Sequence, residues 1–399
     1  MRTGTPGFIP ERLTEARAAR RIPSMSALAR KLGVNASTVS RWEEGTSAPE
    51  ADVLSHLASE LGVRQEFFLR PSFNDRRPVF LRSLSSTLVR DLEYQRAQML
   101  WLHELSATIQ HYAEFPAIDI PDVLGGSNYR QLRDEDIEQI AIDLRRHWRI
   151  GNGPCIDVVA LMERIGIVVG SIEMGTARLD GLCSWSRSEN RPHVLLSTDK
   201  MSFPRRQMDA AHELAHAVLH RGVDHDELKR NLRFIELQAF RLGSAFLMPS
   251  TAYPVEVKMP SLASLISLKE RWRVSVKAQI KRLSDLEVIP ADYAAQLYKL
   301  YSAKGWSREE PLDKKWSLQE PRLLADGLNL IVDAGLRTKA DLLAVEFTMS
   351  TGDIENLCNL PAGWFSREKA DVVRLREPDS RASSTNESVV LQFPSKHRD

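Results

Sequence analysis

The chain has 399 residues, which is long for one hydrophobic core and favours about two to four domains, because domains usually hold roughly 100–200 residues. A formal net charge of +1 excludes a globally cationic nucleic-acid coat, although it leaves room for one locally basic domain. The only cysteines, Cys155, Cys183 and Cys358, form no CxxC pair, so we expect neither a disulfide framework nor a thiolate zinc site.

The distribution of apolar residues argues against export and membrane insertion. The N-terminal stretch MRTGTPGFIPERL has no apolar signal-peptide core. The most apolar segments are broken by charges well short of the ~20 residues that a spanning helix needs. We therefore expect a cytoplasmic protein with no membrane partner.

The pattern of helices and strands predicts a multidomain chain of five segments: residues 8–70, 71–130, 131–310, 311–376 and 377–399. Short helices with glycines just past apolar stretches make the first segment an all-α domain. The second reads as a linker with one or two long helices over 81–114, which we interpret as a dimer contact or interdomain support. Helices mixed with β-rich runs predict an α+β third segment. The fourth reads as a helical C-terminal domain, and the last has a disordered composition.

The first segment has the layout of a helix-turn-helix, in which one helix braces and a second enters the major groove of DNA. Ser24 is placed to cap the first helix, Gly33 makes the turn and Asn35 is placed to cap the second helix. Val39 and Trp42 then share the inward face of that second helix. The remaining positions are the expected DNA contacts: Asn35, Ala36, Ser37, Thr38, Ser40 and Arg41.

The stretch LARKLGVNASTVSRWEEG resembles the lambda-repressor-like (XRE) helix-turn-helix family over about residues 11–70. The resemblance implies binding to a double-stranded DNA operator by a homodimer, and hence association with the nucleoid. Arg41 is the best candidate for a bidentate contact with guanine. Small Ala36 stands where many members carry a long polar side chain, so we expect weak base readout there. The alternative is a helical bundle with no role in DNA binding.

The motif HELAH in the third segment has the spacing of a zinc site on a helix. His212 and His216 lie four residues apart, so their imidazoles share one face and can converge on Zn²⁺. Glu213 is offset by ~100° around the helix and can serve as general base on a metal-bound water. The spacing therefore predicts a catalytic zinc centre.

A catalytic zinc ion needs a third protein ligand. Glu236 lies in the apolar run FIELQAFRLGSAFLM, where a lone buried carboxylate would be costly without a partner. His220 is the rival ligand, but its face has rotated ~80° from His212. We favour Glu236 as the ligand and interpret His220 as a histidine at the helix end or behind the ligands.

RRQMDAAHELAHAVLH and IELQAFRLGSAFLMP together resemble the ImmA/IrrE family of zinc metallopeptidases over about residues 140–310. The resemblance implies an α+β zincin-like fold of gluzincin type and a two-histidine, one-glutamate ligand set. By it, His212, His216 and Glu236 would bind Zn²⁺, with Glu213 as the base. Fusion to an XRE module is a known arrangement of this family. The sequence departs from the family pattern at three positions that leave every ligand in place: Phe240, Leu242 and Gly243.

Several further residues are weaker candidates. Residues 179–186 read either as an edge strand to which a substrate adds or as an internal hairpin strand. Arg205 and Arg206 read either as partners of acidic groups near the site or as a solvated pair. His225 and Tyr253 are possible oxyanion stabilisers, although each is more often a residue with no catalytic role.

The leading hypothesis is a DNA-binding regulator with zinc endopeptidase activity. The resemblance implies a protein substrate, often a helix-turn-helix repressor, whose cleavage would switch on stress-response or mobile-element genes. Two alternatives stay open. One is a transcription factor whose zinc domain is a sensor or assembly module without proteolysis. The other is an antitoxin-like regulator that uses the peptidase fold to hold a partner.

Overall fold

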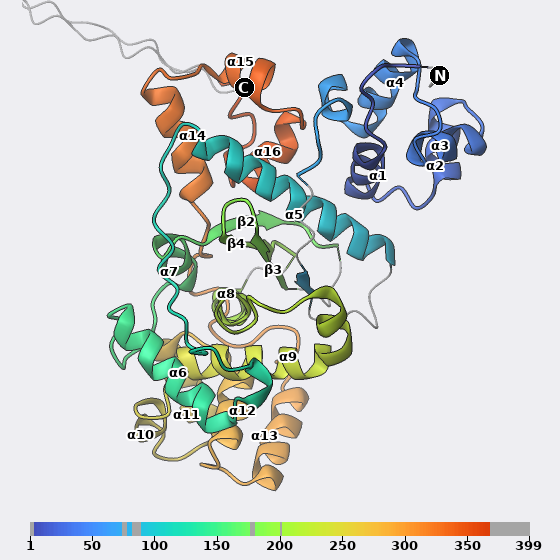
Figure 1. Cartoon of the computed structure of the whole chain (residues 1–399). Helices are drawn as coiled ribbons and strands as arrows, with labels where there is room; N and C mark the ends of the chain where they lie inside the picture. The colour runs from blue at the N-terminus through green and yellow to red at the C-terminus, as the bar shows by residue number, and fades with distance from the viewer. Residues whose placement is uncertain (1–3, 74–77, 82–88, 176–179, 200–201, 368–399) are drawn as a thin grey trace, which may run out of the picture. The chain divides into compact units, whose positions relative to one another are not determined.

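The computed structural model describes residues 4–73, 78–81, 89–175, 180–199 and 202–367 (Figure 1). The tail expected at 377–399 lies outside these residues, as do 82–88 of the long-helix stretch. No helix in the described part of the chain is long and apolar enough to cross a membrane. The chain joins an N-terminal helical region, an α+β region with a mixed sheet and a helical C-terminal part, as the sequence predicted.

Short helices build the N-terminal region: α1 (Pro10–Ala19), α2 (Met25–Leu32), α3 (Ala36–Glu43), α4 (Ala51–Leu61) and the 3₁₀ turn η1 (Gln65–Phe68). Ser24 caps α2 by accepting a hydrogen bond from the Ala27 amide, and Gly33 ends that helix at a φ of 68°. Asn35 occupies the N-cap position of α3, but its side chain makes no capping bond, so this part of the expectation was wrong. Val39 and Trp42 are buried, which leaves the N-terminal half of α3 facing outward.

One long helix, α5 (Val89–Gln110), joins this region to the sheet. Its Trp101 donates to Glu15 of α1, and its Glu104 accepts from Arg12 of α1 at 2.8 Å. Arg12 is 1% exposed and also donates to Glu15. The buried guanidinium of Arg12 is therefore paired with carboxylates at this contact. Helix α5 is therefore held against α1 by packing and by buried hydrogen bonds.

The sheet has four strands in the order β1-β3-β4-β2: β1 (Val79–Leu81), β3 (Gly181–Ser186), β4 (Arg191–Ser197) and β2 (Val168–Ile172). Strands β1, β3 and β4 pair antiparallel, whereas β2 and β4 pair parallel. Helix α5 covers one face and α8 (Phe203–Leu219) the other (Figure 1). All residues of β2, β3 and β4 are buried, as expected for a sheet covered on both faces.

The outer side of β3 is paired with β1 along Val79–Leu81. The interpretation of residues 179–186 as an open edge strand is therefore wrong, because a segment from the presumed linker holds that edge. Leu179 itself lies outside the described residues. The expectation missed this pairing because β1 is only three residues long and carries no alternating apolar pattern.

Helices complete the α+β region: α6 (Asp134–His147), α7 (Val158–Arg164), α9 (His225–Leu247), α10 (Tyr253–Glu256), α11 (Leu262–Trp272), α12 (Val276–Asp285) and α13 (Ala291–Ala303), with the turn η2 (Tyr129–Gln131). The C-terminal part contains α14 (Leu323–Asp333), α15 (Lys339–Asp341), the π-turn η3 (Leu342–Glu346) and α16 (Thr351–Leu357). Helices α14 and α16 pack on β2, so the helical C-terminal part shares the core of the sheet.

Candidate metal centre

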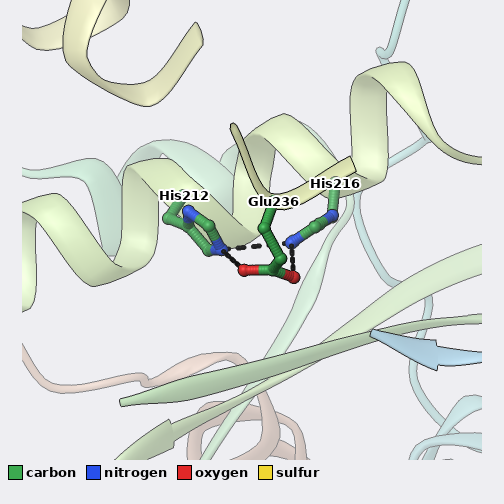
Figure 2. Close-up of side chains that lie close together, drawn as sticks. All are labelled: His212, His216 and Glu236. Atoms are coloured by element: carbon green, nitrogen blue, oxygen red, sulfur yellow. Dashed lines mark hydrogen bonds and ion pairs between the residues drawn. The ribbon is translucent and has the colours of Figure 1, made fainter. Parts of the chain in front are cut away.

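Helices α8 and α9 bring two histidines and a glutamate together (Figure 2). The Nε2 atoms of His212 and His216 lie 3.1 Å apart. Carboxylate oxygens of Glu236 lie 3.2 Å from Nε2 of His212 and 3.3 Å from Nε2 of His216. Three groups from two helices thus direct their ligand atoms at one point.

The two helices approach each other closely at a glycine of α9. A Cβ atom built on Gly243 would lie 3.1 Å from the carbonyl carbon and oxygen of Ala211 and from the His212 amide nitrogen. These are backbone atoms of α8, which cannot rotate away. Glycine in place of the alanine common in the family therefore fits the close packing that carries Glu236 to the histidines.

A directed chain of hydrogen bonds orients His216. Gln238 donates from Nε2 to the carbonyl of Tyr129 at 2.7 Å, so its Oε1 faces Nε2 of His220 at 3.3 Å and must accept. His220 is fully buried, and its burial holds the imidazole pKa well below the usual value, which favours the neutral ring. Its Nδ1 then accepts from Nδ1 of His216 at 3.0 Å.

The consequence of this chain is that the His216 ring is held with its Nε2 atom directed at the centre of the site. Nε2 of His216 lies 3.3 Å from the Glu236 carboxylate and 3.1 Å from Nε2 of His212. Two imidazole nitrogens and one carboxylate that converge in a buried site form a donor set that suits zinc.

Glu213 lies on α8 beside the start of β3. A Cβ atom at Gly181 would stand 2.6 Å from Oε1 of Glu213, so the carboxylate occupies the space that a side chain there would take. Glu213 is only 3% exposed. Gly181 therefore leaves room for the carboxylate one position from the ligand His212.

Aromatic rings lie against both histidines of the candidate site. Phe240 of α9 is 4.4 Å from His212 between ring centroids, and Phe80 of β1 stacks on His216 at 4.9 Å and 17°. Phe240 was noted in the sequence only as a departure from the family pattern. Phe80 was missed, since a Val-Phe pair within an apparent linker carries no signal of its partner more than 100 residues away.

The weaker candidates lie in other settings. His220 ends α8 behind His216, as the interpretation of a helix-end histidine predicts. Tyr253 is fully buried and donates to Gln279 at 2.9 Å, which favours the interpretation of a residue with no catalytic role. His225 is exposed at the start of α9. Arg205 is exposed, whereas Arg206 is 5% exposed and donates to the Ser197 carbonyl, which contradicts a solvated pair.

The expected DNA contacts lie on or just before α3. Asn35, Ala36, Ser37 and Arg41 are exposed, while Thr38 and Ser40 are half-buried. Ser40 donates to Glu44, and Arg41 lies 3.5 Å from the Thr38 hydroxyl. The helix thus presents small polar side chains and one arginine at its outer face.

Comparison with known families matches two parts of the chain. A model described as helix-turn-helix covers residues 15–66, and a peptidase-family model described as the IrrE N-terminal-like domain covers residues 162–284. The first match indicates DNA-binding regulation, and the second indicates a domain of metallopeptidase type. A comparison with curated proteins finds no match. The match over residues 162–284 contains the whole candidate cluster of His212, His216 and Glu236.

Proposed function

We propose that this chain, which joins an XRE-type helix-turn-helix to an ImmA/IrrE-like domain, is a DNA-binding regulator with zinc-dependent endopeptidase activity. The observation that carries the proposal is the convergence of the His212 and His216 Nε2 atoms and the Glu236 carboxylate, at 3.1–3.3 Å from one another, in a buried site. That donor set is the one that a catalytic zinc ion uses. A hydrogen-bond chain from Tyr129 through Gln238 and His220 holds the His216 ring there.

His212, His216 and Glu236 would hold the ion. A bound zinc ion would supply Lewis-acid polarisation of the scissile carbonyl and of the attacking water. Glu213 accepts the proton of that water on a carboxylate oxygen and delivers it to the leaving amine nitrogen. The burial of Glu213 keeps bulk water from competing for that proton. Gly181 leaves space for the Glu213 carboxylate beside the candidate site.

The substrate that we propose is a helix-turn-helix repressor encoded beside this gene. The test is co-incubation of the two purified proteins, with wild type, Glu213→Gln and Glu236→Gln compared and bound zinc measured for each. We expect wild type to cleave, Glu213→Gln to keep zinc but lose cleavage by roughly 10²-fold or more, and Glu236→Gln to lose zinc. Cleavage that persists in Glu213→Gln or in the presence of a chelator would refute the mechanism.

For the DNA-binding part we propose that a homodimer reads an operator through the outer face of α3. Binding to the DNA upstream of its own gene can be followed by anisotropy at fixed salt. Arg41→Ala should weaken specific binding by about 1–3 kcal/mol, because it removes the arginine suited to a bidentate contact with guanine. Ser59→Ala, an exposed change on α4, serves as the control. Equal affinities of the two variants would contradict the role of Arg41.

A second candidate is a regulator whose zinc domain senses or assembles without proteolysis. The observation in its favour is burial: His212, Glu213, His216 and Glu236 are each less than a tenth exposed. A zinc-loaded wild type that binds DNA but cleaves neither the repressor nor other proteins would favour this candidate.

A further inference from the structure

The strand β1 lies where an extended peptide would meet the candidate site. It pairs antiparallel with β3 along three positions, Val79 with Ser184, Phe80 with Cys183 and Leu81 with Leu182. β3 begins at Gly181, which lies against the carboxylate of Glu213. A peptide that added to this side of β3 would use the backbone groups that β1 now occupies.

The side chain of Phe80 lies between β1 and the proposed zinc ligand His216, so β1 covers the candidate site as well as the outer side of β3. Its ring stacks on His216 at 4.9 Å and lies 5.9 Å from His220, and it is 3% exposed. Cys183, its partner on β3, is fully buried on the same face. Phe80 therefore fills the space between β3 and the end of α8 that carries the second histidine ligand.

We infer that β1 is an internal substitute for substrate, which closes the peptidase site by occupying the outer side of β3. A substrate adds to β3 only when β1 leaves, so cleavage is held off in the folded resting chain. This inference rests on the proposed peptidase function. It accounts for ligands that are nearly inaccessible although a catalytic metal needs an open coordination position.

The same geometry indicates the kind of peptide that replaces β1. The peptide is an extended segment that runs antiparallel to β3 and carries a large apolar, preferably aromatic, side chain opposite Cys183. Such a side chain regains the contacts that Phe80 makes with His216 and His220. Peptides with a charged side chain at that position bind poorly, because the charge would be buried without a partner.

A reversible crosslink tests the inference directly. Phe80→Cys places a thiol opposite the native Cys183, within the reach of a cross-strand disulfide. The probe is a dansyl-labelled Ala-Ala-Phe-Ala-Ala hydroxamate, followed by anisotropy with the zinc-loaded protein. We expect the reduced variant to bind the probe at least tenfold more tightly than the oxidised variant. Equal binding of the two forms, or failure of the disulfide to form, would overturn the inference.

A second variant separates opening of the site from general loosening. Phe80→Ala removes the cover, whereas Phe115→Ala removes a similarly buried phenylalanine that packs with the core on the α5 side. Phe80→Ala should bind the probe at least tenfold more tightly than wild type, and Phe115→Ala should bind it as wild type does. Probe affinity in Phe80→Ala no greater than in wild type would count against the substitute role.

Hydrogen exchange of the β3 amides in metal-free protein gives a readout that does not depend on zinc. We expect exchange over Gly181–Ser186 to rise at least tenfold in Phe80→Ala and to stay unchanged in Phe115→Ala. If no form of the protein binds zinc, the proposed function fails. The exchange measurement still tests whether β1, held by Phe80, protects β3. Unchanged exchange in Phe80→Ala would show that β1 is not held by Phe80 and would overturn the inference.

Discussion

At the scale of single residues, the proposed activity depends on the absence of a side chain at Gly181 as well as on the proposed zinc ligands. A methyl group there would meet the Glu213 carboxylate at 2.6 Å and push it out of place. Gly181→Ala should therefore lower cleavage by roughly 10²-fold, the cost of moving a catalytic group by about 1 Å, while zinc binding is kept. Repressor cleavage and zinc content measured on the same preparation check this.

The matched control for that change is Gly222→Ala, because a Cβ atom at Gly222 meets nothing within 4 Å. It should cleave as wild type does. Full activity in Gly181→Ala would mean that Glu213 does not need its present position. Loss of zinc together with activity would instead place Gly181 in support of the metal ligands.

The residues predicted from sequence differ in how local their signals are. His212, Glu213 and His216 follow from spacing within one helix turn, and Glu236 from a lone carboxylate in an apolar run. The geometry brings the three expected ligands together. Tyr253 could not be excluded from sequence, because its burial and its bond to Gln279 depend on helices that follow it in the chain.

At the scale of elements, Glu163 of α7 ties the C-terminal part to the sheet region. Its carboxylate accepts hydrogen bonds from the backbone amides of Arg322 and Leu323 at the start of α14. Burial raises the pKa of Glu163 from 4.5 to about 7. The native state therefore binds this proton more tightly than the unfolded chain does, so stability should fall as pH rises from 4.5 to 7.

Glu163→Gln should remove this dependence, because the amide stays neutral. The pKa shift corresponds to about 3 kcal/mol between the two ends of that pH window. Urea unfolding of wild type and variant at pH 5 and pH 8 measures it, with Glu135→Gln, an exposed carboxylate on α6, as the control. A variant whose stability changes with pH as much as wild type does would contradict the assignment.

The helix that carries HELAH, the following helix and the three longer strands follow from sequence patterns, but the neighbour of β3 does not. The β-rich runs that predicted β2, β3 and β4 are long enough to show burial on both faces. The choice between an edge strand and an internal strand stayed open because β1 consists of three residues from a different part of the chain. Pairing between distant segments depends on tertiary packing, which cannot be inferred from the pattern of residues within either segment.

At the scale of the whole molecule, the helix-turn-helix contacts the C-terminal part as well as α5. Arg20 at the end of α1 donates to both carboxylate oxygens of Asp353 on α16, at 2.8 and 2.5 Å. Arg64 donates its backbone amide to the Thr348 carbonyl, and Val63 forms a bridge with Met349. These contacts link the helix-turn-helix region to a C-terminal part whose helix α16 also packs on the sheet.

Removing one charge from this contact should loosen it measurably. Asp353→Asn should cost about 1–3 kcal/mol, because it weakens a half-buried bond to a charged guanidinium. We expect faster hydrogen exchange in α1 and α16 with no change in α8. Glu60→Gln, which breaks the exposed ion pair with Lys31, should leave exchange unchanged. Equal behaviour of the two variants would contradict a stabilising contact.

The central claim is that His212, His216 and Glu236 form a zinc centre. Calorimetric titration of metal-free protein with zinc tests it most directly, with Glu236→Gln and Glu227→Gln, a change near the start of the same helix, run alongside. The account predicts one tight site per chain in wild type and Glu227→Gln, and affinity weakened by at least about 10²-fold in Glu236→Gln. Equal zinc binding in all three proteins, or none in wild type, would contradict it.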